Sequence, residues 1–153
     1  MGVARLMDGF AATVGEWAED VKGAIEAIWR ESIQAVEAEA QKPRGAGGRM
    51  RIKTGFLRAS LMASTSMMPP ISPTSKPVDG QTYAYTGQEV SAVINGAKLG
   101  QTIFMGYTAA YAAHREYGAR GQPPDAFVRT AAQKWPQIVA AKEAELKGRL
   151  GLA

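Results

Sequence analysis

Apolar side chains recur every three or four residues through the first forty positions of the chain. Acidic residues and a few bases occupy most positions between them. This spacing is close to the 3.6-residue turn of an α-helix and predicts one amphipathic helix over residues 1–42. We expect its apolar face to cover a β-sheet, because its polar face is acidic and therefore unlike that of a membrane-surface helix. The apolar stripe consists of Phe10, Val14, Trp17, Val21, Ile25, Ile28 and Val36.

Proline, glycine and basic residues interrupt this pattern at residues 43–53, which are expected to form a loop. The loop lacks the Gly-Lys-Ser/Thr of a Walker phosphate-binding sequence, so it does not predict a nucleotide site. Residues 54–61 fit a short helix that Thr54 can cap, and residues 62–68 fit a strand. The four prolines between positions 69 and 77 predict an exposed loop, since proline cannot donate to a β-ladder.

Three further short runs have the composition of β-strands. They are residues 82–86, which are aromatic and hydroxyl-rich, residues 89–94, which are rich in β-branched side chains, and residues 102–107. Glycines between the runs indicate turns. The sequence therefore predicts an α+β fold, in which an antiparallel sheet of about three to four strands is packed by a long N-terminal helix and a C-terminal helix.

Helical spacing returns over residues 124–150. Asp125 can cap the start of this helix, and Pro136 predicts either a kink or a new helix start near residues 132–136. The length suits a single domain over residues 1–153. Its predicted parts are an N-terminal helix (1–42), a basic glycine-rich loop (43–53), a short helix plus sheet (54–123) and a C-terminal helix (124–150).

The composition excludes several classes of protein. No apolar run approaches the ~20 residues of a membrane-spanning helix, so we expect no membrane partner. Without cysteine there is neither a disulfide framework nor a thiolate metal site, and a single histidine excludes a multi-histidine site within one chain. We therefore predict no metal and no cofactor.

The net charge of +4 is unevenly distributed. Residues 1–42 contain eight acids and four bases, whereas residues 43–62 contain five bases and no acid. Such segregation is typical of phosphate binding or of complementary faces on neighbouring subunits. The candidates for contact with DNA or with a neighbouring subunit are Arg44, Arg49, Arg51 and Lys53.

His114 is the one side chain that suggests acid–base catalysis, because imidazole titrates near neutral pH. Its neighbours Arg115 and Glu116 are adjacent in sequence, and adjacent residues of a helix or strand do not face one another. No serine occurs in a nucleophile-elbow context, and no pair of carboxylates has a spacing that implies a shared site. We predict a buried or interface role for His114 and no catalytic residue.

Three short segments, in this order, carry a resemblance to a known family. They are a Thr-Gly-x-Leu-Arg-x-Ser segment, a Tyr-Ala-x-x-x-Glu-Tyr-Gly segment and a Pro-x-x-Phe-x-Arg-x-Ala segment. Their residues here are Thr54, Gly55, Leu57, Arg58 and Ser60, then Tyr111, Ala112, Glu116, Tyr117 and Gly118, then Pro124, Phe127, Arg129 and Ala131. In order and spacing, the chain resembles the head–tail joining and tail-completion family of long-tailed bacteriophages and prophages, which includes neck proteins of the tail-terminator kind.

The resemblance implies a non-enzymatic structural protein of the virion, assembled in the host cytoplasm and located at the neck–tail junction. It would form a homo-oligomeric ring, hexameric by that resemblance, which caps the tail tube and joins it to head connector or stopper proteins. In such a ring, the acidic first helix and the basic loop could form complementary faces of neighbouring subunits. The alternative is a small nucleic-acid-binding or DNA-passage factor that uses residues 43–62.

Two pairs of residues within the matched segments have expected roles. Gly55 and Gly118 should occupy turns where φ is positive or where a side chain would clash. Arg58 and Glu116 either form a charge-assisted bond that links the first two segments or remain solvated.

Overall fold

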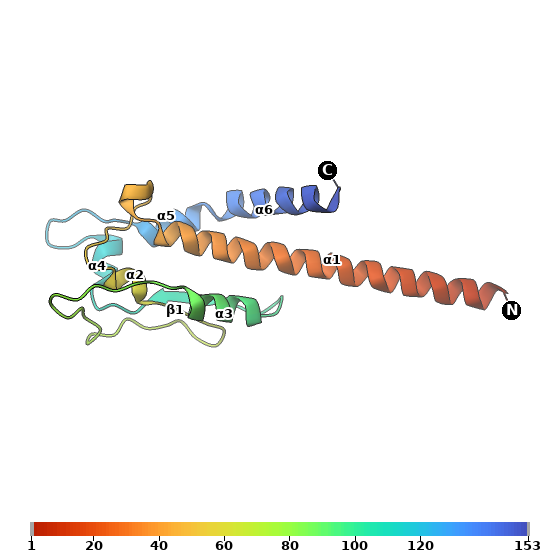
Figure 1. The fold of residues 1–153 in the computed structure, drawn as a ribbon, viewed down its shortest axis with the longest axis horizontal. Helices are drawn as coiled ribbons and strands as arrows, with labels where there is room; N and C mark the ends of the chain where they lie inside the picture. Colours follow the sequence, from red (N-terminus) through yellow and green to blue (C-terminus); the bar gives the residue numbers. More distant parts are fainter. Residues whose placement is uncertain (1, 153) are drawn as a thin grey trace.

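The computed structural model describes residues 2–152 and has an α+β fold composed mainly of helices (Figure 1). Its sheet has two antiparallel strands. None of the described helices is long and apolar enough to cross a membrane. In chain order the elements are α1 (Gly2–Gln41), the 3-10 helix η1 (Arg44–Ala46), α2 (Phe56–Ala59), β1 (Leu61–Ser64), α3 (Gln88–Gly96), β2 (Phe104–Tyr107), α4 (Ala112–Tyr117), α5 (Phe127–Gln133) and α6 (Trp135–Leu150).

The C-terminal half of α1 packs between α5 and α6 on one side and α3 on the other (Figure 1). α6 runs antiparallel to α1, and two ion pairs join the helices. Lys134 Nζ lies 2.6 Å from a Glu39 carboxylate oxygen, and Arg149 Nη2 lies 3.1 Å from Glu31. The hydrogen bond from Lys134 holds the pKa of the Glu39 carboxyl below its ordinary value.

Residues 7–23 of α1 do not cover a sheet, contrary to the sequence prediction. Every residue from 7 to 23 is exposed, including the members of the apolar stripe. Phe10 and Trp17 are 72% and 67% exposed, whereas Ile33 is buried. The segment projects beyond the ends of α3 and α6 (Figure 1). Only the second half of the predicted amphipathic helix therefore contributes to the core.

The hydrophobic core lies where α1, α3, α5 and the sheet meet. The ring of Phe127 packs edge-to-face on Tyr107, with ring centroids 5.0 Å apart. Burial raises the pKa of the Tyr107 hydroxyl well above its ordinary value. The buried residues of the core are Ile33, Met50, Leu57, Leu61, Val90, Ile94, Tyr107, Ala109, Ala112 and Phe127.

The prediction of a strand at residues 89–94 is wrong, because this segment lies in α3. Val90 and Ile94 are four residues apart, so the helix places both on one buried face. A short run of β-branched residues fits both the two-residue repeat of a strand and the 3.6-residue repeat of a helix. In this protein the segment packs against β1 and α1 as a helix.

The sheet therefore has two strands rather than three to four. Residues 82–86 are extended but form no strand; the Tyr83 amide donates to the Thr54 carbonyl at 2.7 Å. The strands predicted at residues 62–68 and 102–107 are confirmed over part of their length. β1 and β2 pair in a register that places Leu61 opposite Tyr107.

The predicted C-terminal helix is two helices, α5 and α6. Pro136 lies in the first turn of α6, where its missing N–H has no intrahelical partner in any case. Pro136 thus marks a new helix start, one of the two predicted outcomes. Asp125 does not cap α5, because the N-cap position is occupied by Ala126, with φ of 52°.

Gly55 and Gly118 occupy the strained positions expected of them. Both have φ of +83°, in the left-handed region. A Cβ at Gly55 would overlap the carbonyl oxygen of Tyr83, and a Cβ at Gly118 would lie 2.7 Å from the carbonyl oxygen of Gln122. At both turns another backbone segment of the same chain lies close to the glycine. Any side chain at the glycine would therefore push the two segments apart.

Gly55→Ala should destabilise the protein more than Gly80→Ala. Both glycines have positive φ, but a Cβ at Gly80 meets nothing within 4 Å. We expect a loss of about 1 kcal/mol in the free energy of unfolding for Gly80→Ala and about 3 kcal/mol for Gly55→Ala, where overlap adds to the backbone strain. Urea denaturation measures both values. Equal losses would show that the turn at Gly55 relaxes without cost.

Candidate functional site

Part of the first matched segment and Tyr111 of the second line the same groove, although they lie about fifty residues apart in the sequence. The groove has a volume of about 720 Å³. Its lining comprises residues 51–58, residues 77–80 and seven residues between 111 and 123. Among the interface candidates named from the sequence, it is lined by Thr54, Gly55, Leu57, Arg58 and Tyr111.

The other interface candidates lie outside the groove. The hydroxyl of Ser60 is buried and donates to the carbonyl of Leu57 at 2.7 Å, while Phe127 belongs to the core. Tyr117 and Pro124 are exposed on the surface. The three sequence segments therefore do not form one continuous patch; only the first and part of the second meet at the groove.

Glu116 is buried and caps helix α5. Its two carboxylate oxygens accept hydrogen bonds from the amides of Val128, at 2.9 Å, and Arg129, at 3.0 Å. These amides lie in the first turn of α5, where backbone donors have no intrahelical partner. Glu116 thus has the role predicted for Asp125. The bond considered between Arg58 and Glu116 is not among the ion pairs of the described chain.

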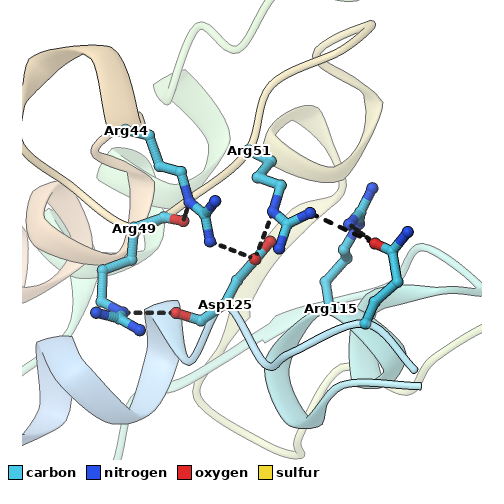
Figure 2. Close-up of polar contacts among 6 residues, drawn as sticks. Arg44, Arg49, Arg51, Arg115 and Asp125 are labelled. Carbon is cyan, nitrogen blue, oxygen red and sulfur yellow. Dashed lines mark hydrogen bonds and ion pairs between the residues drawn. The ribbon is translucent and has the colours of Figure 1, made fainter. Parts of the chain in front are cut away.

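Asp125 is the centre of an arginine cluster, as Figure 2 shows. Its side chain is 1% exposed. Arg44 Nη2 lies 2.9 Å from Asp125 Oδ1, and Arg51 Nε lies 2.8 Å from the same oxygen. Arg49 Nε donates to the backbone carbonyl of Asp125 at 2.6 Å. The basic loop is therefore folded back onto the segment that precedes α5.

This cluster gives a structural role to three of the four basic residues that the sequence predicted to contact DNA or a neighbouring subunit. Arg44, Arg49 and Arg51 each bind Asp125 within the same chain, so their first role is to hold the fold. Lys53 is exposed, and no ion pair of the described chain includes it. Of the four predicted contacts for DNA or a neighbouring subunit, Lys53 is the one whose charge the protein does not use internally.

The groove carries a strongly positive charge. Its lining contains five cationic side chains and one acid, Asp79. Three of the cations come from residues 51–58, and the other two come from residues 111–123. Arg51 and Arg115 also donate to the side-chain oxygen of Gln122, at 3.4 Å each. The cationic residues are Arg51, Lys53, Arg58, Arg115 and Arg120.

Apolar side chains accompany these charges. Ile52 and Val78 line the groove and are exposed. Phe56 and Tyr111 are half-buried beside them, with ring centroids 6.4 Å apart, and burial raises the pKa of the Tyr111 hydroxyl. A groove of this composition suits a partner surface that is both acidic and apolar.

His114 lies at the groove on α4 and is exposed rather than buried. Both carboxylate oxygens of its neighbour Glu116 are bound by the amides of α5, so Glu116 does not orient the imidazole. Among the side chains that the structure describes, no group of three or more His, Cys, Asp or Glu could hold a metal ion.

Sequence reasoning missed the residues that complete the groove. Val78, Asp79 and Arg120 come from loops that carried no motif, and only the fold brings them beside residues 51–58. The positive φ of Arg120, 52°, is a local signal of a special turn, but it is visible only in the structure.

A scan against protein-family models, a search of curated proteins and a search of solved structures each found no match to this chain. Function is therefore inferred from the groove and from the sequence segments that line it.

Asp125→Asn should destabilise the fold, because it removes the charge that neutralises Arg44 and Arg51. We expect a loss of about 2–3 kcal/mol in the free energy of unfolding, which is at the low end for a buried ion pair because the arginines are partly exposed. Asp79→Asn, at the exposed acid of the groove, is the matched control and should change stability by less than about 0.5 kcal/mol. Comparable losses in urea denaturation would contradict the structural role of the cluster.

Proposed function

We propose that the protein is a structural component of the neck–tail junction of a long-tailed bacteriophage, either a tail terminator or a tail-completion protein. One observation carries the proposal. Thr54, Gly55, Leu57 and Arg58 of the first segment and Tyr111 of the second, which are among the residues by which the sequence resembles that family, line one groove. Motif residues that come together on a surface are more simply explained by a shared contact than by separate structural needs.

In this proposal the protein acts in the virion as a homo-oligomeric ring, hexameric by the same resemblance, and makes or breaks no covalent bond. The ring stops growth of the tail tube and presents a docking surface to head connector or stopper proteins. A ring interface is heterologous, so each subunit needs two different faces that complement each other. The positive groove and the acidic, projecting end of α1 are two such faces, on opposite ends of the molecule (Figure 1).

Particles assembled without this protein should have a defect at the tail, because the ring terminates or completes that structure. Electron microscopy distinguishes the two forms of the proposal. Tails of uncontrolled length indicate a terminator, whereas tails of normal length that are separate from heads indicate a joining protein. Normal, infectious particles would contradict both.

The second candidate is a small nucleic-acid-binding or DNA-passage factor, favoured by the five cations of the groove. Three arginines of the basic loop already bind Asp125, which leaves less charge for phosphates than the sequence suggested. Because Arg49 and Arg51 bind Asp125, charge reversal at either residue would disturb the fold of the loop. Such a variant would not test DNA binding alone. Lys53 and Arg120 are the cleaner positions.

Lys53→Glu/Arg120→Glu provides the test of this second candidate. If the groove binds duplex DNA through phosphates, the unaltered protein should lose affinity steeply as salt increases, and the double variant should have a shallower salt dependence. Fluorescence anisotropy of a labelled duplex measures both slopes. Equal, shallow slopes would exclude phosphate binding at the groove.

A further inference from the structure

An apolar stripe on the projecting half of α1 has no partner within the described chain. Its members are spaced alternately by three and four residues, so they lie along one face of the helix. Contiguous apolar surface of this kind marks a site of interaction rather than ordinary solvent contact. The exposed residues of the stripe are Met7, Phe10, Val14, Trp17 and Val21.

The same segment is acidic. Residues 7–23 contain four acids and one lysine. Asp20 follows Trp17 by one turn, so its carboxylate lies at one edge of the stripe, and Glu16, one turn before Asp20, lies farther round on the polar face. No ion pair of the described chain includes either of them. The face combines apolar and negative surface over a helical length of about 25 Å.

The groove has the complementary composition. It carries five cations, of which Arg51 is paired with Asp125, against one acid in its lining, and Ile52 and Val78 add exposed apolar surface beside Lys53. Opposite charges across an interface favour encounter and fix its orientation, while apolar contact supplies most of the affinity. The acidic stripe and the basic groove therefore match in both respects.

The groove cannot take up the α1 segment of its own chain. α1 is one continuous helix of 40 residues, and its N-terminal end points away from α2 and α4, which contribute to the groove (Figure 1). A segment that complements a surface it cannot reach within one molecule can bind that surface on another copy.

We propose that residues 7–23 of one copy bind the groove of a second copy, in a head-to-tail contact. The contact is heterologous, so repetition gives a closed ring or an open filament, depending on the rotation between copies. The head-to-tail contact itself does not depend on the function proposed above; the closing of the contacts into a ring does. Two copies of the α1 segment side by side would instead place two segments together that each have four acids and one lysine, and like charges oppose that arrangement.

Charge reversal on either face tests the proposal with the full chain. Glu16→Lys/Asp20→Lys alters the helix, and Lys53→Glu/Arg120→Glu alters the groove. Each double variant should weaken self-association by about tenfold or more, measured by analytical ultracentrifugation at about 0.15 M salt. Glu143→Lys/Glu145→Lys is the control for the helix variant, because it makes the same change in charge on exposed residues of α6. Circular dichroism confirms that each variant is folded.

Restoration of binding makes the test specific. A chain that carries both reversals has three lysines against two acids in residues 7–23 and three cations against three acids in the groove. The repulsion present in the helix variant is then removed, so this chain should associate more strongly than the helix variant does. An equimolar mixture of the two double variants should also associate, because the unaltered acidic helix of the groove variant then meets the unaltered basic groove of the helix variant. A purely structural effect of the substitutions would be cumulative and would not be reversed by combination.

The outcomes separate this contact from the proposed function. If the unaltered protein forms rings and both reversals leave them intact, the proposed contact is wrong, whereas the proposed ring is still supported. If only the helix variant weakens association and the combined chain does not recover, the α1 stripe binds something other than the groove, and the contact is again wrong. A monomeric unaltered protein at high concentration would overturn both.

Discussion

Asp125, whose carboxylate is buried, links three parts of the chain: the basic loop, α4 and the segment that precedes α5. Arg44 and Arg51 bind it from the basic loop, and its own amide donates to the carbonyl of Arg115 at the end of α4, at 2.7 Å. Because a buried charge is costly unless it is paired, the loop, α4 and the start of α5 must remain in this arrangement. The position of the groove depends on it, since Arg51 and Arg115 both line the groove.

Glu116 acts beside this cluster in a related way. It binds the first amides of α5, and therefore fixes α5 against α4, just as Asp125 fixes the loop against both. The motif residues thus have two kinds of role: some hold the walls of the groove in place, and others form its surface. What remains outside this framework is the segment of residues 7–23 in α1, which is acidic, apolar on one face and exposed. A rigid basic groove and a projecting acidic helix give one small protein two faces suited to repeated contact.

The long regular elements and the tight turns were predictable from the sequence, because their signals are local. Sustained helical spacing predicted α1 nearly to its last residue, and Pro136 marks a new helix start, which was one of the two outcomes predicted for it. Positive φ at Gly55 and Gly118 was likewise expected. The errors fell where a local signal was ambiguous. Residues 89–94 satisfy both periods, and Asp125 looked like a helix cap because its arginine partners are about eighty residues away in sequence.

By itself, then, the sequence determined where the backbone is helical over long spans, where it must turn at glycine, and that positive and negative charge are segregated along the chain. Only the tertiary structure decided which charges are used internally, which half of the apolar stripe is buried, and that residues 51–58 and 111–123 share a groove. The reason is physical. Helices and turns follow from interactions within a few residues, whereas burial and charge pairing depend on contacts between segments that only the folded core brings together.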